Sequence, residues 1–266
     1  SVWAMWHQMQ EGDFVQTYTE KGFRGNDKEW ESMCIPFGED AKICLNGVID
    51  RVDLCSLPGE ELIKIIDYKS SDSQDLLLAK VYYGLQMQLL TYLEAAKEMV
   101  EKEHKGKEAV PAAMLYYAIK EKNLDWKPES EEEYEKRVLD SMKCKGYVNE
   151  EPEIIGHLDK SVVNGGELIP GQKSGVVPVA VDKKGLLKKN SGALSTKDFE
   201  TLIAHTKEKM KECGKAILDG KIEAIPYVYE DNDGCTYCPY GSVCGHESKK
   251  DGVREMKKMS DDEVWE

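Results

Sequence analysis

Two aspartates and a lysine form the pattern in this sequence that is best suited to chemistry. Asp50 lies in Gly-Val-Ile-Asp-Arg-Val-Asp, and Asp67 and Lys69 lie in Asp-Tyr-Lys shortly after it. Hard cations such as Mg²⁺ or Mn²⁺ take oxygen ligands and bind through one or two carboxylates plus substrate phosphate. Asp50, Asp67 and the backbone carbonyl of Tyr68 could supply such a site. Lys69 beside it could hold a phosphate oxygen or an attacking water, which is the chemistry of phosphodiester hydrolysis.

Two adjacent strands must position these residues. Side chains alternate along a strand, so Asp67 and Lys69 share a face with the apolar Ile63 and Ile65. Pro-Gly-Glu at 58–60 is a turn signal between the two segments, which predicts a hairpin that brings Asp50 near Asp67. A surface hairpin with an ordinary Asp–Lys ion pair is the alternative, and it is the commoner meaning of an isolated Asp-x-Lys.

A helix follows the strands and carries two further candidates. Gln88 and Tyr92 are four residues apart, so they lie on one helix face and could both reach a phosphate or a nucleotide. Gln86 competes with Gln88, but only Gln88 is followed by a tyrosine four residues later. The alternative is a plain amphipathic helix in which both are boundary residues beside the apolar stripe of Leu85, Leu89, Leu93 and Ala96.

Together, the three segments resemble the RecB-type branch of the PD-(D/E)xK nucleases, and most of all the nuclease domain of the AddB family of bacterial helicase–nuclease subunits. The likeness extends from about Phe23 to about His246. It implies an α/β, restriction-endonuclease-like core with a central mixed sheet flanked by helices. It also implies Asp50 and Asp67 as metal ligands, Lys69 as the catalytic lysine, and Gln88 with Tyr92 as the motif that follows them.

The same resemblance implies a biological setting. The activity would be that of a Mg²⁺-dependent DNA exonuclease acting on single strands during double-strand-break resection. The partners would be DNA delivered by a helicase and an AddA-type subunit, in the bacterial cytoplasm. Two other functions stay open: a catalytically silent nuclease fold kept as a DNA-binding scaffold, and a CRISPR-associated exonuclease, whose domain is usually shorter after the Gln-x-x-x-Tyr helix.

Three cysteines near the C-terminus, Cys235, Cys238 and Cys244, have the spacing of metal ligands. Three thiolates could join a fourth Cys around an iron–sulfur cluster, or His246 around a zinc ion. The resemblance implies a 4Fe–4S cluster whose fourth ligand lies upstream of this chain. Cys34 is the best internal candidate but a weak one, so we expect this chain to hold the cluster incompletely or not at all.

The remaining cysteines are Cys44, Cys55, Cys144 and Cys213. Cys44 and Cys55 lie in strand-like surroundings, where cysteine is usually a small buried apolar residue. Eight cysteines, three of them at ligand spacing, fit a reducing cytoplasm better than a disulfide framework.

Composition limits the remaining possibilities. The chain has 266 residues, of which 41% are hydrophobic, enough for one sizeable domain with an elaboration, and it has no long apolar run. A net charge of −14 argues against a broad DNA-binding surface but permits a narrow basic track. A domain to which a helicase delivers DNA needs less affinity of its own.

We expect a nuclease domain over 1–225, truncated at its N-terminus, and a Cys-rich clasp over 226–266. The predicted helices cover the N-terminus and 76–102, 131–142 and 196–218, and 110–120 is a core strand. Gly and Pro breaks predict mostly loops, with a short strand or two, over 145–195. His7 is interpreted as structural.

Overall fold

The computed structural model describes residues 10–25, 30–38, 41–70, 75–119, 130–247 and 252–266. The helix expected at the N-terminus, with His7, lies outside these residues. None of the described helices combines the length and the apolar character needed to cross a membrane.

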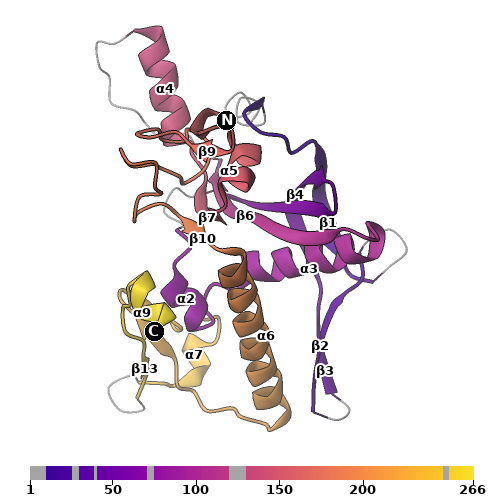
Figure 1. Cartoon of the computed structure of the whole chain (residues 1–266). Helices are drawn as coiled ribbons and strands as arrows, with labels where there is room; N and C mark the ends of the chain where they lie inside the picture. The colour runs from indigo at the N-terminus through magenta and orange to yellow at the C-terminus, as the bar shows by residue number, and fades with distance from the viewer. Residues whose placement is uncertain (1–9, 26–29, 39–40, 71–74, 120–129, 248–251) are drawn as a thin grey trace.

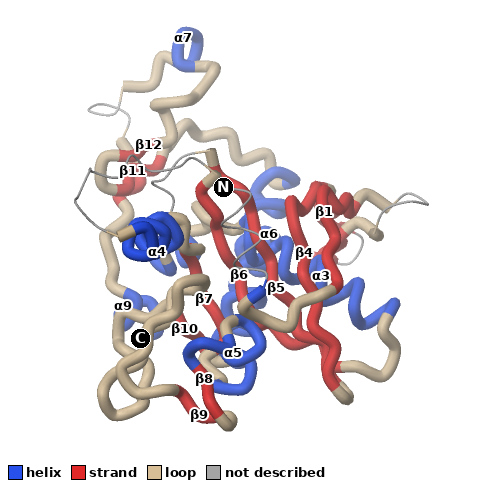
Figure 2. Tube along the Cα trace, turned by 90° about the horizontal axis from the view of Figure 1, so that it is seen from above, coloured by secondary structure: helices blue, strands red, loops and turns tan. Residues whose placement is uncertain are grey.

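A six-stranded mixed sheet forms the centre of the molecule (Figures 1 and 2). Neighbouring strands are antiparallel except for the parallel pairs β5–β6 and β7–β10. In spatial order the strands are β1 (Gln16–Phe23), β4 (Gly47–Leu57), β5 (Glu60–Lys69), β6 (Glu108–Ala118), β7 (Lys145–Asn149) and β10 (Ala193–Leu194). The expected α/β class and mixed sheet are confirmed.

The hairpin predicted between the two acidic segments is present as β4 and β5. Leu57 pairs with Glu60 at its turn, and Gly59 adopts φ +85°, a conformation that glycine reaches without steric cost. The antiparallel register runs from this turn to the pair Arg51–Ile66.

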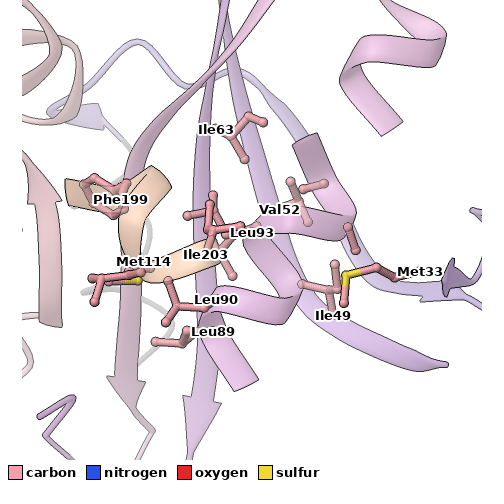
Figure 3. Close-up of a cluster of buried hydrophobic side chains, with 14 of the residues drawn as sticks. Met33, Ile49, Val52, Ile63, Leu89, Leu90, Leu93, Met114, Phe199 and Ile203 are labelled. Atoms are coloured by element: carbon pink, nitrogen blue, oxygen red, sulfur yellow. The ribbon is translucent and has the colours of Figure 1, made fainter. Parts of the chain in front are cut away.

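Two helices cover one face of the sheet, α3 (Gln88–Glu103) and α6 (Thr196–Leu218). Their apolar side chains meet those of the strands in the core shown in Figure 3, which includes Val52, Ile63, Leu89, Leu90, Leu93, Met114, Phe199 and Ile203. The other face packs beneath α5 (Pro152–Leu158) and the loop after it, with Leu62 and Tyr117 buried there. Because both faces are covered, β5 and β6 are buried along most of their length.

The single helix expected from residue 76 to 102 is in fact two helices. α2 (Leu78–Tyr82) ends before Gly84, which adopts φ +76°, and α3 begins at Gln88. The Gln86 side chain closes the break, since it accepts from the amide of Leu77 at 2.9 Å and donates to the carbonyl of Asp75 at 3.0 Å. The break therefore places Gln88 in the first turn of α3.

The other predicted helices agree with the structure. α4 spans Glu131–Ser141, and α6 starts with a capping box between Ser195 and Asp198. Residues 145–195 are more ordered than expected, because they contain α5, η1 (Lys160–Val162), β8 (Val163–Asn164) and β9 (Glu167–Leu168) between β7 and β10.

Two further parts extend from the sheet. The hairpin of β2 (Met33–Phe37) and β3 (Ala41–Leu45), not among the predicted elements, packs beside α6, where the ring of Phe37 lies against Gly214. The C-terminal part holds β11 (Tyr227–Tyr229), β12 (Asn232–Asp233), α7 (Gly241–Cys244), β13 (Arg254–Glu255) and α9 (Asp261–Trp265). Within it, α9 lies beside α2 (Figure 1). Lys80 Nζ of α2 lies 5.5 Å from the ring centre of Tyr229.

Candidate functional site

Asp50 and Asp67 come together where the β4–β5 hairpin opens. The last ladder pair is Arg51–Ile66, and one further step of that register places Asp50 opposite Asp67. Beyond this pair, a side chain replaces the backbone as hydrogen-bond acceptor: Asp50 Oδ2 accepts from the backbone amide of Tyr68 at 2.8 Å. The two carboxylates thus lie at the open end of the hairpin, on the face that α3 covers.

Asp67 is the more enclosed of the two, with 3% of its surface exposed. Burial raises the pKa of its carboxyl group and the neighbouring Asp50 adds to this, whereas Lys69 acts in the opposite direction. Lys69 Nζ lies 2.7 Å from Asp67 Oδ2. The lysine therefore offsets part of the cost of placing two carboxylates side by side.

Lys69 is held from three directions. Besides its ion pair with Asp67, it donates to Gln88 Oε1 at 3.0 Å and lies 5.0 Å from the ring centre of Tyr116. Gln88 Nε2 in turn donates to the hydroxyl of Tyr92 at 3.0 Å. The strands and the first turn of α3 are thereby joined in one hydrogen-bonded row, and Gln86 takes no part in it.

Tyr116 is a site residue that the sequence alone did not reveal. It lies on β6, whose parallel register places it beside Asp67. Burial, together with the charge of Asp67, raises the pKa of Tyr116 to about 12, and burial also raises the pKa of Tyr92. Both phenols therefore keep their protons at neutral pH and can act as hydrogen-bond donors.

A buried charge network lies on the opposite face of the same strands. Asp53 is fully buried, and its Oδ1 accepts from Arg51 Nε at 2.7 Å and from Thr17 Oγ1 at 2.9 Å. Lys64 Nζ lies 3.0 Å from Asp53 Oδ2. Burial opposes ionisation of Asp53, but Lys64 and Arg51 outweigh it and keep the pKa of this carboxyl below its usual value. The network joins β1, β4 and β5 directly behind Asp50 and Asp67.

The edge strand is irregular at this same level. Thr19 and Lys21 of β1 pair with Arg51 and Ile49, so Glu20 stands opposite Asp50. Glu20 has φ +49°, a left-handed conformation that costs a non-glycine residue about 1–2 kcal/mol. Backbone strain of this kind often accompanies functional sites.

A divalent cation fits the donor set at Asp50 and Asp67. Asp67 Oδ2 is buried and makes no hydrogen bond of normal geometry, and its close neighbour is the Lys69 ammonium. No group of three or more His, Cys, Asp or Glu side chains converges among the described residues. A cation here would therefore rely on these two carboxylates, the Tyr68 carbonyl, water and substrate phosphate, which is typical of Mg²⁺.

The three C-terminal cysteines do not form a complete cluster site in the described part of the chain. Cys235, Cys238 and Cys244 are all exposed. The pKa of Cys235 is raised by desolvation, then by Asp233 and by the other two thiols, so the three lie within electrostatic reach of one another. They do not converge into a metal-binding group of three or more side chains in the part of the chain that the structure describes.

Cys34 is not a substitute fourth ligand. It forms a disulfide with Cys44, because these residues face each other directly across the β2–β3 hairpin. The expectation that Cys44 is buried is also wrong, since it lies on the outer side of this hairpin. Cys55 and Cys144 are buried and Cys213 is exposed.

The sequence of the chain matches a known protein family. Residues 1–245 match the PD-(D/E)XK nuclease superfamily. The chain belongs to this superfamily. The membership in the PD-(D/E)XK nucleases that the sequence motifs suggested is therefore confirmed.

The chain is also similar to AddB proteins, which are named as a subunit of the ATP-dependent helicase/deoxyribonuclease. It is 35% identical to that of Lachnoclostridium phytofermentans over 97% of this chain and 21% of the relative. It is 35% identical to that of Caldanaerobacter subterraneus subsp. tengcongensis and 33% identical to that of Alkaliphilus metalliredigens, in both cases over 100% of this chain and 22% of the relative. The chain thus spans about a fifth of the length of these relatives.

Proposed function

We propose that this PD-(D/E)XK nuclease is the Mg²⁺-dependent DNA exonuclease domain of a helicase–nuclease subunit. Its substrate would be single-stranded DNA during resection and recombinational repair of double-strand breaks. The observation that carries the proposal is the row Asp67, Lys69, Gln88, Tyr92, which lies opposite Asp50 on two strands and one helix. The names of the similar proteins supply the helicase–nuclease context.

Each residue has a chemical role in this proposal. Asp50, Asp67 and the Tyr68 carbonyl would hold Mg²⁺, which when bound acidifies water and stabilises the charge on a phosphoryl group. Lys69 is close enough to Asp67 to reach a phosphate oxygen or the attacking water at the same place. Gln88 orients the Lys69 ammonium through its amide oxygen, and Tyr92 fixes the other end of that amide.

Cleavage of single-stranded DNA tests the proposal. The full chain with Mg²⁺ is expected to degrade a labelled oligonucleotide, and Asp67→Ala and Lys69→Ala are each expected to lower kcat by at least ~10²-fold, as for removal of one preorganised electrostatic group. Equal activity in all three proteins would reject these residues as the catalytic set. Binding without cleavage by the wild-type chain would favour the catalytically silent scaffold instead.

The wider context is also part of the proposal. Residues 1–225 would form the nuclease domain and 226–266 the cysteine-rich clasp, with an AddA-type subunit as partner and the bacterial cytoplasm as location. Cys235, Cys238 and Cys244 would bind a 4Fe–4S cluster only with a fourth ligand from outside this chain. Iron and sulfide analysis after anaerobic purification should give well below one cluster per chain, and stoichiometric iron would contradict this.

A further inference from the structure

A cleft lined by lysines lies next to the proposed active site. It has a volume of about 490 Å³ and lies between β7, the loop 189–192, the segment 75–76 before α2 and Asp261 of α9. We call it the lysine cleft, after the four lysines that line it: Lys143, Lys145, Lys173 and Lys189. Three aspartates also line it, Asp75, Asp140 and Asp261. Cations thus outnumber acids here, whereas the chain as a whole has 36 Lys and Arg against 50 Asp and Glu.

The sheet connects this cleft to Asp67. Tyr116 of β6 pairs on one side with Asp67 of β5 and on the other side with Lys145 of β7. Adjacent strands lie about 4.8 Å apart, so the backbones at Asp67 and Lys145 are separated by roughly 10 Å. Lys145 also points to the face on which Lys69 and Tyr116 meet, because it lies directly opposite Tyr116 in the β6–β7 ladder and opposite residues point to the same face. A single strand with one phosphate at Asp67 and Lys69 would therefore reach the cleft with its next phosphates.

Lys143 shows that the cleft suits anions. Its ammonium donates to the carbonyl of Ser174 at 2.7 Å and forms no ion pair with a carboxylate in the described part of the chain. Burial, and then the neighbouring Lys173, lower the pKa of Lys143 to about 8. A phosphate group in the cleft would relieve both effects, because an anion favours the charged form of a lysine.

The other lysines can exchange partners. Lys145 and Lys189 form ion pairs of 2.8 Å and 2.7 Å with Asp75 and Asp262, and the Lys173 pair with Asp140 is longer, at 3.7 Å. In each pair at least one side chain is more than half exposed. Solvent-exposed pairs of this kind contribute little to stability, so a phosphate can replace the carboxylate at little cost.

We propose that the lysine cleft binds the phosphodiester backbone of a single DNA strand on one side of the bond at the Asp50–Asp67 site. This proposal rests on the nuclease function proposed above and specifies how its substrate is held. It also places DNA binding in a chain of net charge −14 at one local site rather than on a broad surface.

Salt-dependent binding tests the cleft without any cleavage. The probe is a fluorescein-labelled oligothymidylate of about fifteen nucleotides, and anisotropy is measured in EDTA at several salt concentrations. For Lys145→Gln/Lys173→Gln in the full chain, we expect about tenfold weaker binding. The slope of log K against log salt should also become shallower by roughly 0.7 for each phosphate that the variant no longer neutralises.

The matched control is Lys183→Gln/Lys184→Gln, which removes the same charge from exposed lysines that do not line the cleft. This variant should bind within about twofold of wild type with an unchanged slope, apart from small long-range effects. Lys143→Gln is tested separately because this side chain is packed, and urea unfolding of every variant confirms that it folds. Affinity and salt slope in Lys145→Gln/Lys173→Gln that match those of the control variant would overturn the proposal.

A kinetic comparison separates this inference from the nuclease proposal. With Mg²⁺, the loss of kcat/KM in Lys145→Gln/Lys173→Gln should be larger for the oligonucleotide than for bis-p-nitrophenyl phosphate, which is too small to span both sites. An equal loss on the two substrates would count against the cleft. If the wild-type chain cleaves neither substrate, the nuclease proposal fails, and the anisotropy result still decides whether the cleft binds DNA.

Discussion

At the residue scale, the arrangement around Lys69 is the most specific feature of the molecule. A lysine ammonium is a compact charge on a flexible stem, so its position must be set by its neighbours. Here the neighbours are a carboxylate, an amide oxygen and an aromatic face, contributed by β5, α3 and β6. Gln88 carries no charge, and in the proposed function it orients the lysine.

Replacement of Gln88 by Ala is therefore expected to lower kcat for DNA cleavage by roughly tenfold, which is less than the roughly 10²–10⁴-fold contribution of a group that transfers a proton itself. The physical reason is the loss of the 3.0 Å hydrogen bond that fixes Lys69 Nζ. Tyr92→Phe should have a smaller effect in the same direction, because it removes only the 3.0 Å hydrogen bond at the far end of the amide. Single-turnover cleavage at saturating protein measures both effects.

Gln86→Ala provides the comparison for this prediction. The Gln86 side chain bonds to the backbone of Leu77 and Asp75 and does not touch Lys69, so its loss should lower stability more than the cleavage step. If Gln86→Ala and Gln88→Ala reduced the single-turnover rate equally, the orienting role of Gln88 would be wrong.

At the element scale, the hairpin and α6 were predictable from sequence, whereas the helix break was not. The hairpin is indicated by its turn residues and by the alternation of apolar and polar side chains, and α6 by the capping box at Ser195. All of these signals are local in the sequence. The break at Gly84 depends on the Gln86 side chain reaching back to Leu77 and Asp75, an interaction that no local propensity encodes. The pairing of Cys34 with Cys44 likewise depends on the unpredicted register of β2 and β3.

The Asp53 network makes an element-scale prediction about β1, β4 and β5. Asp53→Asn leaves the guanidinium of Arg51 and the ammonium of Lys64 buried without a compensating charge. Removing one partner of a buried charge set usually costs about 3–5 kcal/mol. We expect a decrease of this size in the free energy of unfolding, measured by urea denaturation.

Glu31→Gln is the matched control for Asp53→Asn. It removes a carboxylate from its pair with Lys102, and the side chains of Glu31 and Lys102 are 75% and 54% exposed. The expected loss is much smaller than for Asp53→Asn, because water solvates the charge left behind. A decrease for Asp53→Asn no larger than that for Glu31→Gln would show that the buried network does not stabilise the strands.

At the scale of the whole molecule, the site could be predicted only in part, because its members come from separate elements. Asp50, Asp67 and Lys69 belong to one hairpin, whose local pattern indicates that they meet. Tyr116 and Lys145 lie near Asp67 only because the strands are ordered β5–β6–β7 in the sheet. That order requires the parallel crossover from β5 to β6 and the antiparallel return to β7. Strand order is a property of the complete fold, so neither residue carries a signal in its own neighbourhood.

The same whole-molecule packing makes stability depend on pH through Lys143. The groups that act on it are Lys173, which lowers its pKa, and Asp140, Asp159 and Cys144, which raise it, while burial is the largest influence. Its folded-state pKa of about 8 lies below the ordinary value of 10.5, so between these values the unfolded chain binds more protons than the folded chain. Stability therefore rises with pH over this window, because a penalty present below pH 8 is relieved as the folded lysine loses its proton.

Lys143→Met removes this penalty at every pH. The variant should thus gain stability relative to wild type at pH 7, and the difference in the free energy of unfolding should shift in favour of wild type by pH 10. Urea denaturation at both pH values measures the difference, with the exposed Lys183→Met as control. Lys143→Met also loses the hydrogen bond to Ser174. Because a neutral amine still donates this bond in wild type, its loss lowers the stability of the variant by a similar amount at pH 7 and at pH 10. The change of the difference with pH therefore reports the charge of Lys143 alone. A difference that stays constant from pH 7 to pH 10 would mean that Lys143 is well solvated, and its contribution to anion binding in the lysine cleft would then be no greater than that of an ordinary surface lysine.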